Sequence, residues 1–222
     1  MKKAVYITGL LSSLFIQPGY SQKIRTLFYD DILYGKVKQV SEAYYLSGTM
    51  GVELTDTTWY DDKGNTLENH RRTRHGTLFK EKYTISNEAS GKKMQIIGSE
   101  HDQNLSAKFD AKGNLAEYYS HFKNGSLNFK SLYDYDQKNN LVVFRNFDKN
   151  NILTQKRTYN YDNDDQLIAL DNWGENGKLE YHTDFQYLGV DKTGNWTKRI
   201  GRNKLQSGKT EELTIIRQIT YY

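Results

Sequence analysis

The sequence predicts an all-β protein, an antiparallel meander of about fourteen strands that forms a curled sheet, a partial tube or an irregular barrel. A short phrase recurs along the chain. It begins with an aromatic residue, which is usually followed by Asp, and continues with two polar residues and then Gly, Asn or Asp. Such recurrence is typical of repeat architectures. The segments between its copies alternate apolar and polar residues, as half-buried strands do. Because open twisted sheets seldom exceed about ten strands without curling, the sheet is expected to bend strongly.

The first 21 residues predict a cleaved signal peptide. A basic start at Met1–Lys3 precedes a mostly apolar stretch, Ala4–Ile16, and the small residues of Gly19–Ser21 occupy the usual cleavage positions. The cut is expected before Gln22, which leaves residues 22–222 as a single β domain. The apolar stretch is too short to span a bilayer as a helix. We therefore expect a secreted or periplasmic protein whose mature chain has no transmembrane span.

The composition excludes several functional classes. The chain has 31 Lys and Arg against 27 Asp and Glu, and without Lys2 and Lys3 the balance is 29 against 27. A nearly neutral chain offers no electrostatic footprint for nucleic acid. Cysteine is absent, so the sequence predicts neither a lipid-bearing cysteine, a disulfide framework nor a thiolate metal site.

The recurring phrase is interpreted as a turn. Its Asp can accept hydrogen bonds from backbone N–H groups two residues further on, and its fifth position must tolerate the left-handed conformation. The only proline, Pro18, lies in the leader, so the mature turns depend on Gly, Asn, Asp and Ser. The predicted structural turn residues are Asp61, Gly64, Asp110, Gly113, Asp136, Asn139, Asp148, Asn151, Asp162, Asp165, Gly177, Asp191 and Gly194.

The spacing of the turns defines a repeating hairpin of about 26 residues. Successive turns of a meander lie at opposite ends of its strands. One rim should carry the turns at Asp61, Asp110, Asp136, Asp162 and Asp191, and the other those at His75, Lys123, Asp148 and Gly174.

Alternation is clearest in residues 178–187, where Leu179, Tyr181, Thr183, Phe185 and Tyr187 share one face. In the last strand the apolar face is interrupted by Arg217. The segments 36–46 and 211–222 open and close the meander. Unpaired edges are a liability, so the last strand is expected to pair with the first or with another chain.

The phrase Tyr-Asp-x-x-Gly-Asn, whose pattern recurs over residues 59–196, resembles the YD repeat of Rhs-type bacterial proteins. The segments Leu33–Val40 and Asp191–Arg199 are similar to short secreted Rhs-like proteins of Bacteroidetes-type bacteria. The resemblance implies a curled β-sheet shell. Nothing in the chain matches the toxin tips of the large members, so it implies no toxin activity.

No catalytic, cofactor or metal signature stands out. The five histidines, His70, His75, His101, His121 and His182, lack metal-ligand spacing. Paired acids at Asp30–Asp31, Asp61–Asp62 and Asp164–Asp165 are explained by turn chemistry in two of the three cases. We predict no catalytic residue, no cofactor and no metal. Two carboxylates brought together by folding would serve a cryptic glycan-active enzyme, which remains an alternative.

Aromatic and basic side chains are the remaining candidates for binding. Tyrosines on a concave sheet face can stack on sugar rings or anchor a peptide, although core or ladder packing is the favoured explanation. The basic residues near His75 suit an acidic glycan or a partner, or form a solvated strand face. The candidate ligand-binding residues are Tyr119, Tyr133, Tyr159, Tyr181, Trp173, Arg72 and Arg74.

Together these patterns predict a secreted or periplasmic, non-catalytic β-repeat protein with a binding or structural role in the cell envelope. Its expected partner is an envelope protein or a glycan. A carbohydrate-binding module with exposed aromatic residues is the second interpretation. An outer-membrane barrel is disfavoured because segment 69–74 places charge on both strand faces, whereas a lipid-facing band must be apolar.

Overall fold

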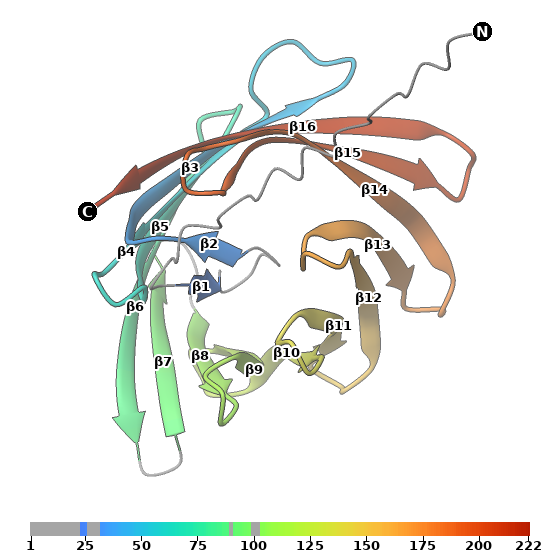
Figure 1. The fold of residues 1–222 in the computed structure, drawn as a ribbon. Coiled ribbons are helices and arrows are strands. Elements are labelled where there is room, and N and C mark those ends of the chain that lie inside the picture. The colour runs from blue at the N-terminus through green and yellow to red at the C-terminus, as the bar shows by residue number, and fades with distance from the viewer. Residues whose placement is uncertain (1–22, 26–31, 89–90, 99–102) are drawn as a thin grey trace, which may run out of the picture.

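The structure is a computed structural model that describes residues 23–25, 32–88, 91–98 and 103–222. The predicted leader and its cleavage site lie outside these residues. All regular elements of the described chain are strands (Figure 1). They are β1 (Lys23–Arg25), β2 (Ile32–Tyr34), β3 (Val37–Leu46), β4 (Leu54–Tyr60), β5 (Thr66–Thr73), β6 (Leu78–Glu88), β7 (Gly91–Gly98), β8 (Gln103–Phe109), β9 (Leu115–Phe122), β10 (Leu127–Tyr135), β11 (Leu141–Asp148), β12 (Leu153–Tyr161), β13 (Leu167–Gly174), β14 (Leu179–Val190), β15 (Trp196–Leu205) and β16 (Thr210–Tyr221). Across these residues, no helix is long and apolar enough to cross a membrane.

Strands β3 to β16 form a closed antiparallel barrel of 14 strands, in which each strand pairs with its neighbours in the chain. The barrel closes where β16 pairs with β3, in a register that runs from Leu213 opposite Leu46 to Tyr221 opposite Val37. The predicted all-β meander is therefore confirmed, and of the three expected shapes the barrel is the one formed. Closure removes the two exposed edges, because the first and last strands satisfy each other's backbone groups.

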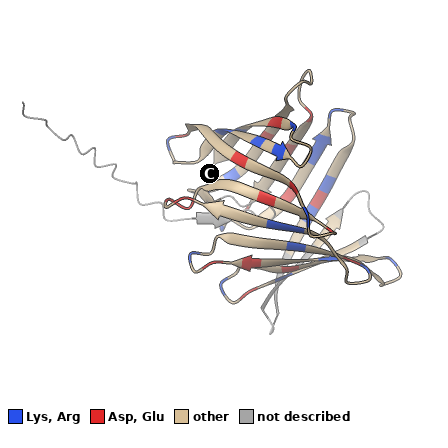
Figure 2. Cartoon of the chain, turned by 90° about the vertical axis from the view of Figure 1, so that its right-hand side faces the viewer, with Lys and Arg blue, Asp and Glu red and all other residues tan. Residues whose placement is uncertain are grey.

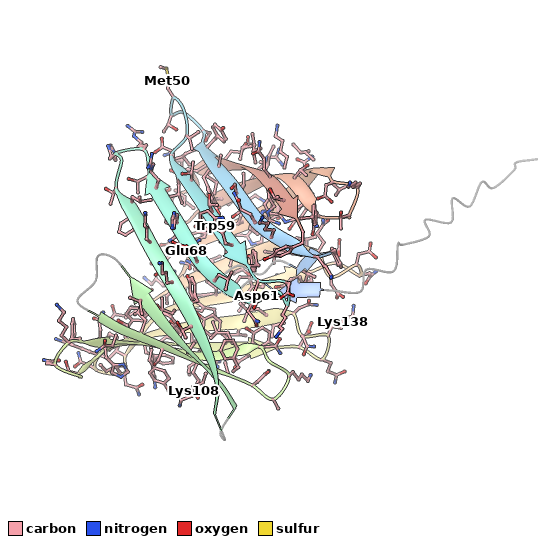
Figure 3. All side chains as sticks on the ribbon, turned by 90° about the vertical axis from the view of Figure 1, so that its left-hand side faces the viewer. Met50, Trp59, Asp61, Glu68, Lys108 and Lys138 are labelled. Atoms are coloured by element: carbon pink, nitrogen blue, oxygen red, sulfur yellow. The ribbon has the colours of Figure 1, made fainter. Side chains whose placement is uncertain are left out.

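The turns of the meander alternate between two ends of the barrel. We call rim A the end formed by turns 61–65, 110–114, 136–140, 162–166 and 191–195, and rim B the end formed by turns 47–53, 74–77, 123–126, 149–152, 175–178 and 206–209. Met50 lies at rim B, whereas Asp61 and Lys138 lie at rim A (Figure 3). The repeating unit is thus a two-stranded hairpin with two different ends.

Six of the seven phrases form a turn closed by an Asp, and the phrase with Gly174 at that position uses Asn176, which accepts from the backbone N–H of Lys178. The Asp61 carboxylate accepts hydrogen bonds from the backbone N–H groups of Lys63 and Asn65, at 2.9 and 2.8 Å, and the turns at Asp110, Asp162 and Asp191 repeat the pattern. The fifth position has positive φ at Gly64, Gly113, Asn139, Asn151, Asp165, Gly177 and Gly194. Short polar residues and Gly adopt this conformation at the lowest cost.

A β-bulge accompanies the turns of rim A and reverses the side-chain alternation. Trp59 pairs with Glu68 and Tyr60 with Thr66, so Leu67 is an extra residue. Ile168 occupies the same position between β12 and β13. Both extra residues are exposed, at 45% and 42%. The bulge allows the aromatic residue before the turn and the residue after it to face the lumen together.

The lumen near rim A is filled by a repeated aromatic and aliphatic layer. Leu115, Leu141 and Leu167, spaced 26 residues apart, are all buried. The hydroxyl groups of Tyr135, Tyr161 and Tyr187 donate to the backbone carbonyls of these leucines at 2.9, 3.0 and 2.9 Å. Each hairpin is therefore bonded to the one before it through the same tyrosine contact.

Bulges also correct one sequence expectation. Tyr181, Thr183, Phe185 and Tyr187 share the inner face of β14, but Leu179 does not, because the register shifts between Asn172 and Trp173 and leaves Glu180 as an extra residue. Leu179 is consequently 37% exposed. Period-two counting fails wherever a strand carries an inserted residue.

The β1–β2 hairpin lies inside the barrel outline at rim A (Figure 1). Leu33 is fully buried against Val37, Val40 and Tyr60. The Asn195 side chain accepts from the backbone N–H of Tyr34 at 2.8 Å and donates to the Tyr34 carbonyl at 2.9 Å. This N-terminal segment is therefore held to the barrel wall by both apolar packing and a side chain that imitates a strand partner.

Gly35 provides the turn between this hairpin and β3. It has φ of +86°, and a Cβ atom there would lie 3.0 Å from Thr193 Cγ2. We expect Gly35→Ala to reduce the free energy of unfolding by about 2–3 kcal/mol, because left-handed strain and a steric clash add together. Gly48→Ala is the matched control, since Gly48 has φ of +82° with no atom within 4 Å. Urea unfolding should rank Gly35→Ala as the more destabilised, and equal losses would contradict the contact argument.

The outer face of the barrel carries both signs of charge along its strands (Figure 2). Ion pairs join neighbouring strands on this face, among them Arg145 with Asp134 at 2.7 Å and Arg202 with Glu212 at 3.1 Å. Lys204 binds Asp184 at 2.8 Å in the same way. Each such exposed pair contributes at most about 1 kcal/mol. Charged side chains therefore lie along the outer face and are partly exposed there.

His182 is the outer-face residue with the clearest pH dependence. Its Nδ1 lies 2.7 Å from Asp171 Oδ1 and its Nε2 lies 3.0 Å from Asp184 Oδ1. The hydrogen bond to Asp171, assisted by Asp184, raises the pKa of His182 above 6.5 in spite of partial burial. The charged ring is therefore favoured in the folded state.

We expect the stability advantage of wild type over His182→Gln to be full below pH 6.5 and to disappear as pH rises through the raised pKa of the folded state. Urea unfolding of both proteins from pH 5 to pH 9, the range around the usual pKa of about 6.5, checks this. An NMR titration of the His182 ring gives the folded-state pKa independently. A difference in stability that does not change with pH would contradict the assignment.

Candidate binding site in the barrel lumen

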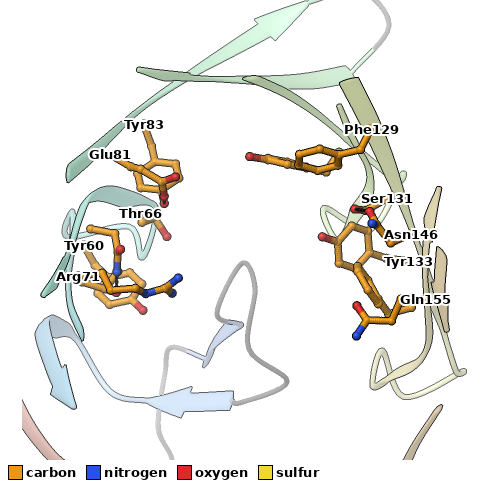
Figure 4. Close-up of a pocket in the computed structure, with 14 residues that line it drawn as sticks. Tyr60, Thr66, Arg71, Glu81, Tyr83, Phe129, Ser131, Tyr133, Asn146 and Gln155 are labelled. Carbon is orange, nitrogen blue, oxygen red and sulfur yellow. Dashed lines mark hydrogen bonds between the residues drawn. The ribbon is translucent and has the colours of Figure 1, made fainter. Parts of the chain in front are cut away.

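A cavity of about 380 Å³ lies in the lumen between strands β4–β6 and strands β9–β12 (Figure 4). Its size falls in the range of small-molecule sites, roughly 300–1,000 Å³. The lining residues alternate along their strands and point inward from opposite walls. They are Thr58, Tyr60, Thr66, Asn69, Arg71, Glu81, Tyr83, Tyr118, Phe129, Ser131, Tyr133, Phe144, Asn146 and Gln155.

Aromatic rings stand on both walls of the cavity. Tyr118 packs on Phe129 with ring centroids 5.8 Å apart, and Tyr133 packs on Phe144 at 5.3 Å. Tyr83 lies on the facing wall (Figure 4). Burial, followed by the nearby Glu81 charge, raises the pKa of both Tyr83 and Tyr118 far above the usual value. These phenols stay neutral, so the rings provide an apolar surface with hydroxyl tips.

The charged residues at the cavity are largely paired with groups of the protein. The Arg71 guanidinium donates to Asp56 Oδ2 through Nε at 3.0 Å and through Nη2 at 2.9 Å. Asp56 is 2% exposed and is also bonded by the Asn69 amide. Glu81 accepts from the Tyr83 hydroxyl at 2.6 Å. Since Asp56 offsets Arg71, the lining is close to neutral, with Glu81 as its remaining charge.

The wall formed by β10–β12 supplies amide and hydroxyl groups in an ordered row. Ser131 donates to Asn146 Oδ1 at 2.9 Å, Asn146 donates to Thr154 at 3.1 Å, and Gln155 donates to Asn172 Oδ1 at 2.7 Å. Asn146 and Asn172 stand one 26-residue repeat apart, and Ser120 precedes them by the same interval. The repeat therefore places a polar side chain at the same height of successive hairpins.

A second group of charged side chains points inward at the closing seam, the junction where β16 pairs with β3. Arg217 of β16 donates to Glu42 of β3 at 2.9 and 2.7 Å, and the two side chains are 2% and 8% exposed. The centroid of the Trp196 ring lies 3.4 Å from the guanidinium carbon of Arg217 and 4.6 Å from the guanidinium carbon of Arg199. The Arg217 interruption of the apolar pattern is thus a buried ion pair between the first and last strands of the barrel.

The structure does not bring the seven predicted ligand-binding residues together. Tyr133 lines the cavity. Tyr159 faces inward but is packed in the core with Leu141 and Leu167. Tyr119 lies on the outer face, where its hydroxyl donates to Glu117 at 2.5 Å.

Of the remaining four, Trp173 and Tyr181 line a second, more open pocket of about 490 Å³ at the rim B end of β13–β15. Arg72 is exposed on the outer face of β5, and Arg74 lies in a rim B turn, where it forms an ion pair with Glu53 at 2.8 Å. The basic cluster of the sequence is therefore divided among the lumen, where Arg71 lies, the outer face of β5 and a rim B turn.

Most cavity residues were not singled out by the sequence, Glu81, Asn146 and Gln155 among them, and Arg71 was noted only as part of the basic cluster near His75. A usable signal exists for one of these, because Asn146 belongs to the 26-residue polar series. Arg71 and Glu81 differ from outward residues only in strand parity, which the bulges shift. Their convergence depends on curvature that brings β5 and β6 opposite β10–β12.

The cavity has one carboxylate, Glu81, among its lining residues. The paired acids at Asp61–Asp62 and Asp164–Asp165 lie in rim A turns, and Asp30–Asp31 lies outside the described residues. The two-carboxylate arrangement of glycosidases is thus not formed by the described residues at this cavity. Among the described residues, no cluster of three or more His, Cys, Asp or Glu side chains has the geometry of a metal site.

Fold and cavity together define the chain as a closed antiparallel β-barrel with a partly polar lumen. Among solved structures it is similar to a porin-like protein from Bacteroides uniformis, at 10% identity with a TM-score of 0.54, over 83% of this chain and 98% of that one. It also matches a LolA superfamily protein from Nitrosomonas europaea at 11% identity with a TM-score of 0.35, over 84% and 86% of the two chains. At this identity the first likeness shows the barrel fold alone. No protein-family model and no curated protein matches the sequence.

Proposed function

We propose that this protein is a non-catalytic β-barrel binding protein of the bacterial cell envelope that holds a small ligand in its lumen. The observation that carries the proposal is the 380 Å³ cavity, whose walls combine aromatic rings with amide and hydroxyl groups. Concave sites with a few converging polar groups are the usual form of small-molecule sites.

Charge on the outer face supports a barrel that operates in water. Arg145, Lys156 and Asp171 point away from the lumen on three adjacent strands, with Arg145 opposite Lys156 and Asp171 opposite Thr158. A membrane barrel presents an apolar band at this height, and a Lys or Arg in it costs about 2–4 kcal/mol. A periplasmic or secreted location, as the leader over residues 1–21 predicts, suits such a surface.

Membership of the Rhs-like group stays a prediction from the Tyr-Asp phrase. A structural role through a protein partner is the alternative within the envelope. The cavity favours a ligand-binding role, because a purely structural barrel would gain stability by filling its lumen with side chains.

A lumen-filling substitution tests the proposal. Gln155 points into the cavity, whereas its neighbour Lys156 points outward. We expect Gln155→Trp to abolish retention of a small molecule and Lys156→Trp to leave retention unchanged, because only the first ring occupies the cavity. Each protein is incubated with a low-molecular-mass envelope extract, and bound mass is read by native mass spectrometry.

Circular dichroism and thermal unfolding establish that both variants fold. If folded wild-type protein retains nothing that folded Gln155→Trp does not also retain, the lumen is not the binding site and the proposal fails.

A further inference from the structure

We infer that the lumen cavity is a site for a neutral saccharide of one or two rings, which rests on the proposed binding function and names its ligand class. The inference comes from the combination of ring faces, amide groups and near-neutral charge on the two walls (Figure 4).

Aromatic ring faces in the cavity suit the apolar faces of a sugar. Tyr60 and Tyr83 stand on one wall, and Phe129, Tyr133 and Phe144 stand on the other (Figure 4 labels all but the last). Because Tyr60 and Tyr83 are only 3% and 8% exposed, the aromatic surface open to a ligand is mainly that of Phe129, Tyr133 and Phe144, which are partly exposed. The C–H faces of a pyranose ring are apolar and pack on aromatic rings through dispersion and the ring quadrupole.

The polar groups suit hydroxyl groups at the edge of such a ring. Asn146 and Gln155 each combine two N–H donors with a carbonyl acceptor, and Ser131 and Thr58 add hydroxyls that donate and accept. The bonds Ser131–Asn146 and Gln155–Asn172 fix the orientation of the two amides. Since a side-chain amide has four hydrogen-bonding positions, each retains capacity for a ligand hydroxyl.

The same polar row argues against an acyl chain. An alkyl chain in the cavity would cover the remaining hydrogen-bonding positions of Asn146 and Gln155 without giving them a partner. Each such uncompensated group costs about 1–3 kcal/mol. A lipid site would need an apolar lining, which eight of the fourteen lining residues do not provide.

The charge argues against an acidic ligand. Arg71 is already bound by the buried Asp56 at 2.9 and 3.0 Å, so its charge is offset. Glu81 would repel a carboxylate or phosphate. A neutral polyol is therefore favoured over uronic acids and phosphorylated sugars.

The experiment has two arms. In the first, isothermal titration measures wild-type binding to glucose, N-acetylglucosamine, maltose and chitobiose, with glucuronic acid and palmitate as the competing classes. In the second, the molecule retained from the envelope extract is released by denaturation, hydrolysed in acid and analysed for neutral sugars, acidic sugars and fatty acids.

We expect at least one neutral saccharide to bind, and the released molecule to yield neutral sugar. Asn146→Ala and Gln155→Ala should each weaken binding about tenfold or more, the loss expected when a ligand hydroxyl loses its partner. The matched control is Asn160→Ala, an exposed amide on the same strand as Gln155, which should bind like wild type.

Release of fatty acid or acidic sugar would overturn the ligand class and leave the binding function intact. Failure to retain any molecule in the lumen would instead overturn the proposed function. Binding of a neutral saccharide that is unaffected by Asn146→Ala, Gln155→Ala and Gln155→Trp would place the sugar site elsewhere and overturn the inference alone.

Discussion

Replacing Glu42 with alanine is expected to lower the free energy of unfolding by about 3–5 kcal/mol, the cost of breaking a buried ion pair by removing one partner. Arg217 is 2% exposed and receives its carboxylate contact across the seam at 2.7 Å. Without Glu42 its guanidinium charge remains in the core, where desolvation is expensive. Urea unfolding followed by circular dichroism and tryptophan fluorescence measures the loss.

Two further variants sharpen this prediction. Glu212→Ala breaks the ion pair with Arg202 on the neighbouring strand. The side chains of Glu212 and Arg202 are 40% and 44% exposed, so the free energy of unfolding should fall by less than about 1 kcal/mol. The double variant Glu42→Met with Arg217→Met should recover most of the loss, because apolar replacement of a buried pair is often neutral. Equal effects of Glu42→Ala and Glu212→Ala would show that the seam pair is not buried in solution.

Deleting Leu213–Tyr222 is expected to abolish cooperative folding of the barrel. These residues make up most of β16, which is hydrogen-bonded to β15 on one side and to β3 on the other. Their loss exposes two strand edges at once and removes Ile215, Arg217 and Ile219 from the lumen. Gel filtration and thermal unfolding should report an aggregated or unfolded chain, whereas a stable, unchanged monomer would refute closure by this strand.

A subtler control separates loss of the edge from loss of the side chains. The triple variant with Ala at Thr214, Ile216 and Gln218 removes outer-face side chains of the same strand and keeps its backbone pairing with Ala43, Tyr45 and Ser41. It should fold and remain monomeric, with a moderate decrease in the midpoint temperature of thermal unfolding. A collapse as severe as that of the deletion would mean that outer-face packing, rather than strand pairing, holds the seam.

The strand class and the turn chemistry were predictable because they are local properties. An Asp that binds backbone N–H groups two and four residues away, and a Gly or Asn that adopts positive φ, act within one turn. The period of about 26 residues follows from counting these turns. Its physical meaning, the Tyr135 bond to Leu115 and its repeats, requires two neighbouring hairpins to be seen together.

Side-chain direction was predictable only between bulges. Alternation predicts that Leu179 shares the face of Tyr181 and Thr183, but Leu179 lies on the opposite face because Glu180 is an extra residue. The same effect hid the cavity wall on β5, where the extra residue Leu67 resets the parity ahead of Asn69 and Arg71. One inserted residue exchanges the two faces of a strand, and no local sequence pattern predicts where such an insertion occurs.

By itself, the sequence determined that this protein is an antiparallel β-meander with Asp-capped turns at two unlike ends, because hydrogen bonds within a turn and strand alternation depend on neighbours in the chain. Only the tertiary structure decided that β16 closes on β3, that β2 packs at rim A, and that Arg71, Glu81, Asn146 and Gln155 face one cavity. These outcomes depend on curvature accumulated over fourteen strands. That curvature brings together residues that are far apart in the chain, and their spacing in the sequence does not predict their contact.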